Sequence, residues 1–427
     1  MLKKALVYLI FATLALVLTA AVAAFLILKV ALAPGRDEWP ARFQAGPVAI
    51  DVGVPTAIRL ATSSWFAPWL AGRTLETAHG PVRFGWNAAS ETLELNCAPC
   101  SATVPALGSA PIRLESLRAT VRRDAGTLGG TLEAAPPARP LAVDGRADDG
   151  ILRGRWTGRL TQQALHIDIQ VPETPIARWY KVLAPDLAEL QRARIGGALA
   201  LGAQVGLPAG TFAVQPRIAD FTVDGLGTET LANARSSCGA PSRLGNESWL
   251  ARAVIAAEDQ RFFTHPGYDM TELAASLEVN QKASKAERGG STLSQQLAKI
   301  LVTGGEQSAD RKLRELLYAV EMEQTLGKAR ILQLYLDNAP WGPDGLCGAE
   351  AAAKRYFKRN AARLEPAQAV WLAAMLHNPA AELDKWRSTG QIDAARAKWV
   401  AEGIRGITRG QREMVLKGVE KAKFAAP

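Results

Sequence analysis

A glutamate at position 258 lies where a carboxylate is costly to place. Leu250, Val254 and Glu258 are spaced at i, i+4 and i+8, so a helix puts Glu258 on the same face as its apolar residues. A buried carboxylate is unfavourable unless it is paired with a cation or used in chemistry. In chemistry it would be a general base, with a pKa raised by apolar surroundings. A buried ion pair with an arginine is the structural alternative.

A second polar group follows two glycines in residues 289–299. Thr292 and Gln295 have the spacing of a capping box, which begins a helix after a glycine turn. The free N–H groups at a helix start can also bind anionic or hydroxyl-rich ligands. Lys299 lies about two turns further along, where a long cationic side chain can reach a phosphate.

Two cations and a carboxylate are grouped in residues 311–315. Arg311 and Glu315 are i, i+4 neighbours on a helix, and as a surface ion pair they would contribute only ~0.2–0.5 kcal/mol. Lys312 adds a second cation beside them. The functional alternative is a cluster that neutralises an anionic leaving group such as a pyrophosphate.

These groups form three motifs in a recognisable order. Residues 258–267 read E-D-x-x-F-x-x-H-x-G, residues 289–299 read G-G-S-T-x-x-Q-Q-x-x-K, and residues 311–315 read R-K-x-x-E. The series resembles the peptidoglycan glycosyltransferase family, which includes monofunctional transglycosylases and the glycosyltransferase domain of class A penicillin-binding proteins. The likeness covers about residues 249–379.

The resemblance implies an enzyme that polymerises lipid II into β-1,4 glycan strands and releases undecaprenyl pyrophosphate. It implies that Glu258 is the base and Glu315 the second essential carboxylate. Mg²⁺ or Mn²⁺ would accompany the substrate pyrophosphate, with Glu315 as its candidate protein contact, and no organic cofactor is expected. The implied substrate-binding residues are Ser291, Thr292, Gln295, Gln296, Lys299, Arg311 and Lys312. The implied structural residues of the first motif are Asp259, Phe262, His265 and Gly267.

The expected partners are lipid II, the growing lipid-linked glycan, the inner membrane and other cell-wall synthesis proteins, but not nucleic acid. No S-x-x-K serine follows the motifs, so a transpeptidase domain is not expected. A lysozyme-like, glycan-cleaving enzyme is the alternative activity, because two carboxylates on helices can serve either direction. A non-catalytic envelope scaffold or lipid-binding protein is the alternative of a different class.

Three positions depart from the family pattern. Ala275 and Gln307 align where many members carry arginine, and Asp337 aligns where asparagine is usual. The loss of two cations would weaken a pyrophosphate clamp, which favours the scaffold alternative.

The fold class expected for the whole chain is α+β. Residues 240–384 contain long helical runs with few glycines and predict a mostly helical, lysozyme-like glycosyltransferase domain. Residues 385–427 predict basic helices that form a solvated packing extension rather than a nucleic-acid arm. Residues 42–228 read as short alternating segments between glycines, prolines and aspartates, typical of antiparallel strands with one solvated face. A helix is expected near residues 176–190, and strand character resumes at residues 195–205.

The role of residues 42–228 is open. Their pattern faintly resembles the curved sheets of AsmA-like envelope proteins, which cradle lipid, but a plain β-domain that acts as a spacer from the membrane or docks a partner is the favoured interpretation. Because every motif lies after residue 246, we expect this β-rich region to be dispensable for chemistry.

An uncharged, mostly apolar run from residue 5 to 28 follows Lys3 and Lys4. Its length predicts a transmembrane anchor within residues 1–33, with a cytoplasmic N-terminus and a periplasmic catalytic domain at the inner membrane. A cleaved signal peptide is the alternative, since residues 31–33 imitate a cleavage site. The 50 basic and 41 acidic side chains give a net charge of +9, which favours a polyanionic neighbour.

Four cysteines in an exported protein are more often bridged than free, because that compartment is oxidising. Cys97 and Cys100 are expected to form a local structural disulfide, since neither a second CxxC nor a nearby histidine supports a metal site. The remaining pair, Cys238 and Cys347, is expected to form the second disulfide.

Overall fold

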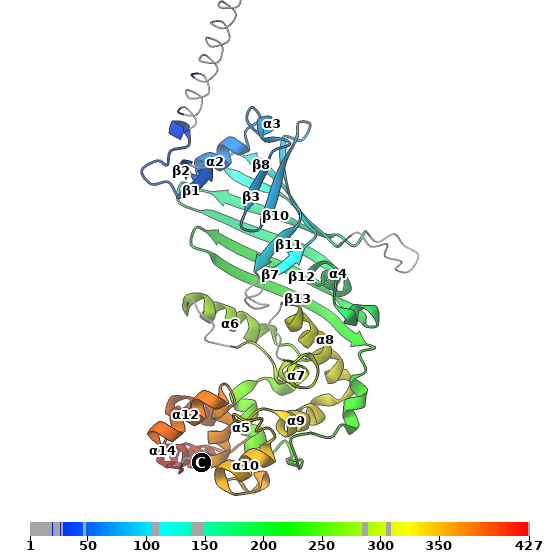
Figure 1. Ribbon diagram of the computed structural model, residues 1–427, viewed down its shortest axis with the longest axis vertical. Coiled ribbons are helices and arrows are strands. Elements are labelled where there is room, and N and C mark those ends of the chain that lie inside the picture. Colours follow the sequence, from blue (N-terminus) through cyan, green and yellow to red (C-terminus); the bar gives the residue numbers. More distant parts are fainter. Residues whose placement is uncertain are drawn as a thin grey trace, which may run out of the picture. The chain divides into compact units, whose positions relative to one another are not determined.

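The computed structural model divides the chain into two compact units (Figure 1). Unit 1 contains residues 1–101, 114–173 and 200–215, and unit 2 contains residues 102–113, 174–199 and 216–427. The residues that the structure describes are 19, 26, 29–45, 48–103, 111–137, 149–283, 289–304 and 309–425.

A nine-stranded sheet runs in the order β13-β12-β11-β10-β9-β8-β5-β4-β3. Its strands are β3 (Thr74–Thr77), β4 (Gly80–Asn87), β5 (Thr92–Cys97), β8 (Ser116–Asp124), β9 (Thr127–Ala135), β10 (Leu152–Leu160), β11 (Leu165–Pro175), β12 (Arg194–Leu207) and β13 (Thr211–Asp224). Two further strand pairs are β1 (Pro40–Ala45) with β2 (Val48–Gly53), and β6 (Cys100–Thr103) with β7 (Pro111–Leu114). The short helices of unit 1 are α2 (Val54–Ala61) and α3 (Ala67–Leu70).

The antiparallel pairing and the alternating burial of this sheet follow from the sequence. Successive residues of β10 are alternately buried and exposed from Leu152 to Arg159, as expected for a sheet with one solvated face. Trp156 lies on the buried side, and its indole N–H donates to the Thr120 carbonyl at 3.0 Å. Gly130 pairs with Trp156 in the register. A Cβ at Gly130 would meet the Thr120 carbonyl oxygen, so this close approach requires glycine.

Unit 2 is mostly helical. Its first elements are α4 (Ile176–Leu183) and the 3₁₀ helix η2 (Ala188–Gln191). They lie where the sequence predicts a helix, near residues 176–190. The later helices are η3 (Thr228–Asn233), α5 (Trp249–Glu258), η4 (Phe262–Thr264), α6 (Met270–Ala283), α7 (Leu293–Ala298), η5 (Lys299–Thr303), α8 (Ala309–Thr325), α9 (Gly327–Asn338), α10 (Ala349–Phe357), η6 (Ala361–Arg363), α11 (Pro366–Met375), α12 (Pro379–Thr389), α13 (Ala394–Gly403) and α14 (Arg409–Lys421).

The core of unit 2 is centred on α5. Seven of its ten residues are buried, from Leu250 to Ala257, and α5 packs against both α11 and α13. Ser248 caps the helix by accepting a hydrogen bond from the Ala251 N–H. The helix ends at Glu258, so the packing of α5 fixes the position of that carboxylate.

The structure contradicts the prediction of an N-terminal transmembrane helix. Among the residues that the structure describes, no helix is long and apolar enough to cross a membrane. The described fold is a mixed α and β fold without such a helix. Most of residues 5–28, from which the transmembrane helix was predicted, lie outside the described residues.

Within residues 385–425, α13 and α14 are helical as predicted, but several of their apolar side chains are buried rather than solvated. Val400, Ala401, Ile404 and Val415 are fully buried in the core cluster of unit 2. The helices α13 and α14 are therefore part of the core that surrounds α5.

Helix α8 is anchored by residues that precede their partners in α8 by more than 90 positions. The buried Glu189 of η2 pairs with Arg314 at 2.8 Å, and the Tyr180 hydroxyl of α4 donates to the Leu313 carbonyl at 3.1 Å. Glu321, which is 1% exposed, accepts hydrogen bonds from the backbone N–H groups of Leu226 and Thr228. Residues 174–199 and 216–228 therefore belong with the helical domain, although the predicted boundary placed them in the β-rich region.

This anchor predicts a local effect for Glu189→Ala. The Arg314 guanidinium would lose its charged partner, and a hydrogen bond to a charged group contributes roughly 1.5–3 kcal/mol. We expect faster amide hydrogen exchange in α8, measured by mass spectrometry, and unchanged exchange in α13. The matched control is Glu229→Ala, which removes an exposed glutamate from the same unit. Equal exchange in the two variants would contradict the anchor.

Both expected disulfides are present. Cys97 is bonded to Cys100, and Cys238 to Cys347, with Cα atoms 5.3 and 5.2 Å apart. The second disulfide joins the segment before α5 to the loop between α9 and α10. It closes a chain separation of 109 residues, against 3 for the first.

The two disulfides are predicted to differ in their contribution to stability. In the chain-entropy model, removing Cys238–Cys347 costs about 5 kcal/mol and removing Cys97–Cys100 about 1.6 kcal/mol, because the larger loop restricts the unfolded chain more. Urea unfolding of the two double Cys→Ser variants, followed separately for each unit, measures both values. A larger loss for the Cys97/Cys100 variant would contradict this ranking.

Candidate functional site

Glu258 lies at the end of α5 in a network of three side chains. Gln296 of α7 donates from Nε2 to one carboxylate oxygen at 3.1 Å, and Arg396 of α13 contacts the other at 3.3 Å. The Tyr335 hydroxyl of α9 donates to the side-chain Oε1 of Gln296 at 2.9 Å and fixes the orientation of that amide. The Glu258 side chain is 12% exposed. It is thus held by neighbours and still open to a reactant.

Burial raises the pKa of Glu258 above its ordinary value, and the charge of Asp259 adds to that rise. Arg396 and the Gln296 hydrogen bond act in the opposite direction. A carboxylate with a raised pKa is a stronger base when ionised, which suits the removal of a proton from a hydroxyl. The Tyr335 hydroxyl stays protonated because burial and the nearby Glu258 charge raise its pKa.

The remaining residues of the first motif are structural. His265 Nε2 lies 2.9 Å from Asp259 Oδ2, and the Gly267 N–H donates to His265 Nδ1. Nδ1 therefore accepts, so Nε2 carries the proton and donates to Asp259. The same Asp259 oxygen accepts the Leu293 N–H at 2.9 Å, which joins the first motif to the second.

Gly267 and Phe262 complete this structural role. Gly267 has a positive φ of 94°, and a Cβ there would lie 2.9 Å from the Ala319 carbonyl oxygen. Its own carbonyl accepts the Thr292 hydroxyl at 2.7 Å. Phe262 is fully buried, with the Lys328 ammonium 4.5 Å from its ring centroid.

The residues of the second motif have two roles: some shape the start of α7, and others belong to the candidate site. Thr292 and Gln295 form the predicted capping box, and both are buried. The other three residues of this motif lie beside Glu258 or beside the Lys312 ammonium: Gln296, Ser291 and Lys299. Gln296 contacts Glu258, and the Ser291 hydroxyl contacts the Lys312 ammonium. Lys299 is exposed and near enough that its charge helps to lower the pKa of Lys312.

The third motif forms a compact cationic cluster around one buried carboxylate. Glu315 is 3% exposed, and its two oxygens lie 3.1 Å from Arg311 Nε and 3.1 Å from Lys312 Nζ. Burial lowers the pKa of Lys312, and Glu315 opposes that shift. Glu315 therefore holds the two cations close together and favours the charged form of Lys312. With Lys299 nearby, the cluster can bind a doubly charged anion such as a pyrophosphate.

Glu315 does not fit the role of a metal ligand. Both of its oxygens are already paired with cations, and a cation-bound carboxylate is a poor site for a second positive charge. In the described part of the chain, no group of three or more histidine, cysteine, aspartate or glutamate side chains could hold a metal ion.

Sequence reasoning missed Arg396, Tyr335 and the function of Asp337. Asp337 is buried and accepts hydrogen bonds from the Ser242 N–H and hydroxyl, both at 2.8 Å. An asparagine Oδ1 could accept both bonds as well, so these contacts give no structural reason for the departure from asparagine. Ala275 lies on α6, and Gln307 lies outside the described residues.

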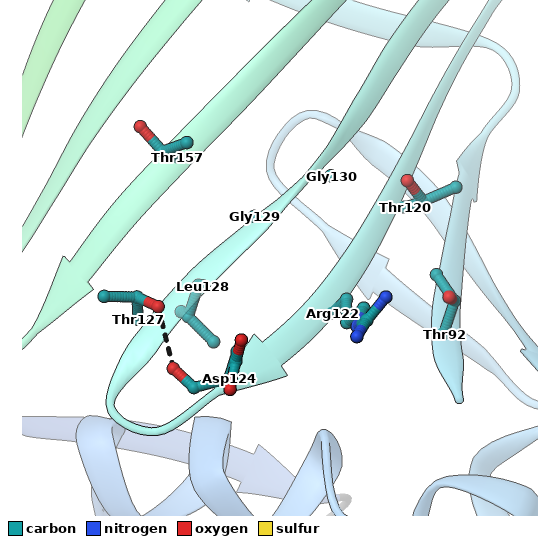
Figure 2. Close-up of a pocket in the computed structure, with 9 residues that line it drawn as sticks. All are labelled: Thr92, Thr120, Arg122, Asp124, Thr127, Leu128, Gly129, Gly130 and Thr157. Atoms are coloured by element: carbon teal, nitrogen blue, oxygen red, sulfur yellow. Dashed lines mark hydrogen bonds between the residues drawn. The ribbon is translucent and has the colours of Figure 1, made fainter. Parts of the chain in front are cut away.

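A separate pocket of about 410 Å³ lies on the sheet of unit 1 (Figure 2). Its lining includes Thr92, Thr120 and Arg122, and Figure 2 shows Asp124 beside the turn into β9. None of the motif residues lines it. This pocket is not part of the candidate site.

Comparison with known proteins agrees with the site. Residues 245–405 match the family model described as Transglycosylase. Proteins named biosynthetic peptidoglycan transglycosylase are similar to this chain. The one from Aromatoleum aromaticum is 49% identical over 130 residues, 30% of this chain and 56% of the relative. The one from Alcanivorax borkumensis is 43% identical over 152 residues, 36% of this chain and 61% of the relative.

The helical site and these matches define a glycosyltransferase domain of transglycosylase type. Residues 245–405 are thus similar to the peptidoglycan glycosyltransferase family. The chain spans 56% to 61% of the length of those two relatives, and the matched part begins near residue 245.

Proposed function

We propose that this protein polymerises lipid-linked disaccharides into peptidoglycan glycan strands with release of a lipid pyrophosphate. The observation that supports this most is the division of the charged residues into two groups. Glu258 lies among few charges and has a raised pKa, whereas Glu315 lies among cations. A base and an anion-binding cluster are the two parts that this transfer needs.

In the proposed reaction, Glu258 accepts the proton of the 4-hydroxyl of the acceptor sugar as that oxygen attacks the anomeric carbon of the donor. The bond from the anomeric carbon to the pyrophosphate oxygen breaks, and the anomeric centre inverts. The leaving group departs as an anion, so it needs charge neutralisation more than a proton. Arg311, Lys312 and Lys299 provide that charge. We propose that any divalent ion arrives with the substrate pyrophosphate.

We also propose that the glycosyltransferase domain works in an oxidising compartment, where its lipid-linked substrate is presented at the membrane surface. The two disulfides support this location, because such bonds persist in oxidising compartments. Other cell-wall synthesis proteins are the proposed partners.

Purified full-length protein incubated with labelled lipid II tests the activity. We expect polymer that disappears when an inhibitor mimicking the lipid-phosphate donor is added. Absence of polymer from protein that binds this inhibitor would favour the scaffold alternative, which the missing cation at Ala275 suggests. Shortening of preformed glycan without polymer would favour the glycan-cleaving alternative.

A further inference from the structure

Arg396 reaches the proposed base from a helix that lies beyond the three motifs. It is 138 positions from Glu258 along the chain, yet its guanidinium lies 3.3 Å from Glu258 Oε1. The contact exists because α13 packs against α5 and α11. Val400, one turn after Arg396, is fully buried in that packing.

The guanidinium is fixed by bonds to two other helices. Its Nε donates to the Ala374 carbonyl of α11 at 3.1 Å, and its NH2 group donates to the Ala257 carbonyl of α5 at 3.4 Å. Ala257 lies in the last turn of α5, where unpaired carbonyls attract a cation. The Trp399 ring lies 5.5 Å from the guanidinium carbon. The side chain is 25% exposed. Three helices thus hold the cation in one orientation toward Glu258.

The charged and polar groups that act on Glu258 come from four places. Asp259 follows it in the chain and disfavours its ionised form, as burial does. Tyr335 of α9 is neutral, and Gln296 of α7 donates a neutral hydrogen bond. Arg396 is the charged donor among these contacts. Without it, a buried carboxylate next to Asp259 would be ionised only at higher pH.

We propose that Arg396 is a positioning residue for Glu258, which fixes the orientation of the carboxylate and keeps it ionised so that it can accept the acceptor's proton. The catalytic role of Arg396 in this inference rests on the proposed function. The ion pair between Arg396 and Glu258 does not depend on that function and can be measured without substrate.

The test compares Arg396→Gln with the wild-type full-length protein. The first measurement is the pKa of Glu258 by ¹³C NMR of protein labelled at the glutamate carboxyl carbon, with the signal assigned by its loss in Glu258→Gln. We expect the pKa to rise by about one to three units, because the opposite charge is gone. The second measurement is kcat/KM for lipid II against pH. We expect the acidic limb to move to higher pH by the same amount, with activity recovering in alkaline buffer.

Two further variants separate positioning from packing. Arg396→Lys keeps the charge without the planar set of donors, so its Glu258 pKa should stay near the wild-type value while kcat falls. Arg412→Gln is the matched control, because Arg412 of α14 bonds only to the backbone carbonyls of Glu402 and Ile404 in the described contacts. It should leave the pKa of Glu258 unchanged.

Some outcomes would overturn the inference. An unchanged Glu258 pKa in Arg396→Gln, or an equal shift in Arg412→Gln, would assign Arg396 to packing alone. If Arg396→Gln does not fold, Arg396→Lys decides: an unchanged kcat in that variant would reject the positioning role, because the planar set of donors would then be unnecessary. A wild-type protein that makes no polymer would reject the proposed function, but the NMR comparison would still decide the ion pair.

Discussion

Glu258→Gln is expected to slow polymerisation of lipid II by about 10²–10⁴-fold, the usual contribution of a general base. Glutamine keeps the shape of the side chain and can still bond to Gln296, but it cannot accept the proton of the acceptor hydroxyl. The cationic cluster around Glu315 does not contact Glu258 in the described structure, so a donor-mimicking inhibitor should bind this variant almost normally. Initial rates and inhibitor affinity measure the two effects separately.

The control for this substitution is Glu402→Gln, which neutralises an exposed glutamate of α13 in the same domain. It should retain wild-type rates. Full polymerase activity in Glu258→Gln would reject the base assignment and favour the scaffold alternative. Loss of inhibitor binding in that variant would mean that Glu258 acts on the donor and not on the acceptor.

Glu315→Gln is expected to weaken the donor-mimicking inhibitor by about tenfold or more, corresponding to roughly 1.4 kcal/mol, and to abolish most of the activity. Arg311 and Lys312 would lose the carboxylate that holds them together. Because burial already lowers the pKa of Lys312 and Glu315 opposes that shift, the substitution should lower it further. Lys312 would then lose its proton at a lower pH than in the wild type.

The lowered pKa of Lys312 in this variant predicts a pH dependence that a simple loss of packing would not produce. Inhibitor affinity in Glu315→Gln should fall at a lower pH than in the wild type as the solution becomes alkaline. Isothermal titration calorimetry across that range measures the difference. Parallel pH profiles in the two proteins would show that Glu315 acts on the donor site without controlling the charge of Lys312.

The sequence predicts the local parts of this structure well. The alternation in β10 follows from a period of two, and the capping box of Thr292 and Gln295 depends on residues three positions apart. The three motifs also place Glu258 and Glu315 in separate groups. In each case the information lies within a few turns or one strand.

Contacts between distant helices are not encoded by such local patterns. Arg396 lies i, i+4 from the buried Val400, which could have indicated that it faces the core. Nothing in its neighbourhood identifies α5 as the helix that α13 meets. For the same reason, the sequence does not predict the pairing of Glu189 with Arg314, and the predicted β-rich region includes residues 174–199 and 216–228, which belong to unit 2.

The anchor of α8 also has a consequence for the order of folding during synthesis. The ribosome makes α4 and η2 before α8, and the Tyr180 hydroxyl meets its carbonyl partner only after another 133 residues. Pairing over such separations slows folding, because a long loop must close before the contact forms. Tyr180 and Glu189 therefore emerge before their partners exist. A nascent chain stopped before residue 309 would leave this surface uncovered and open to chaperones.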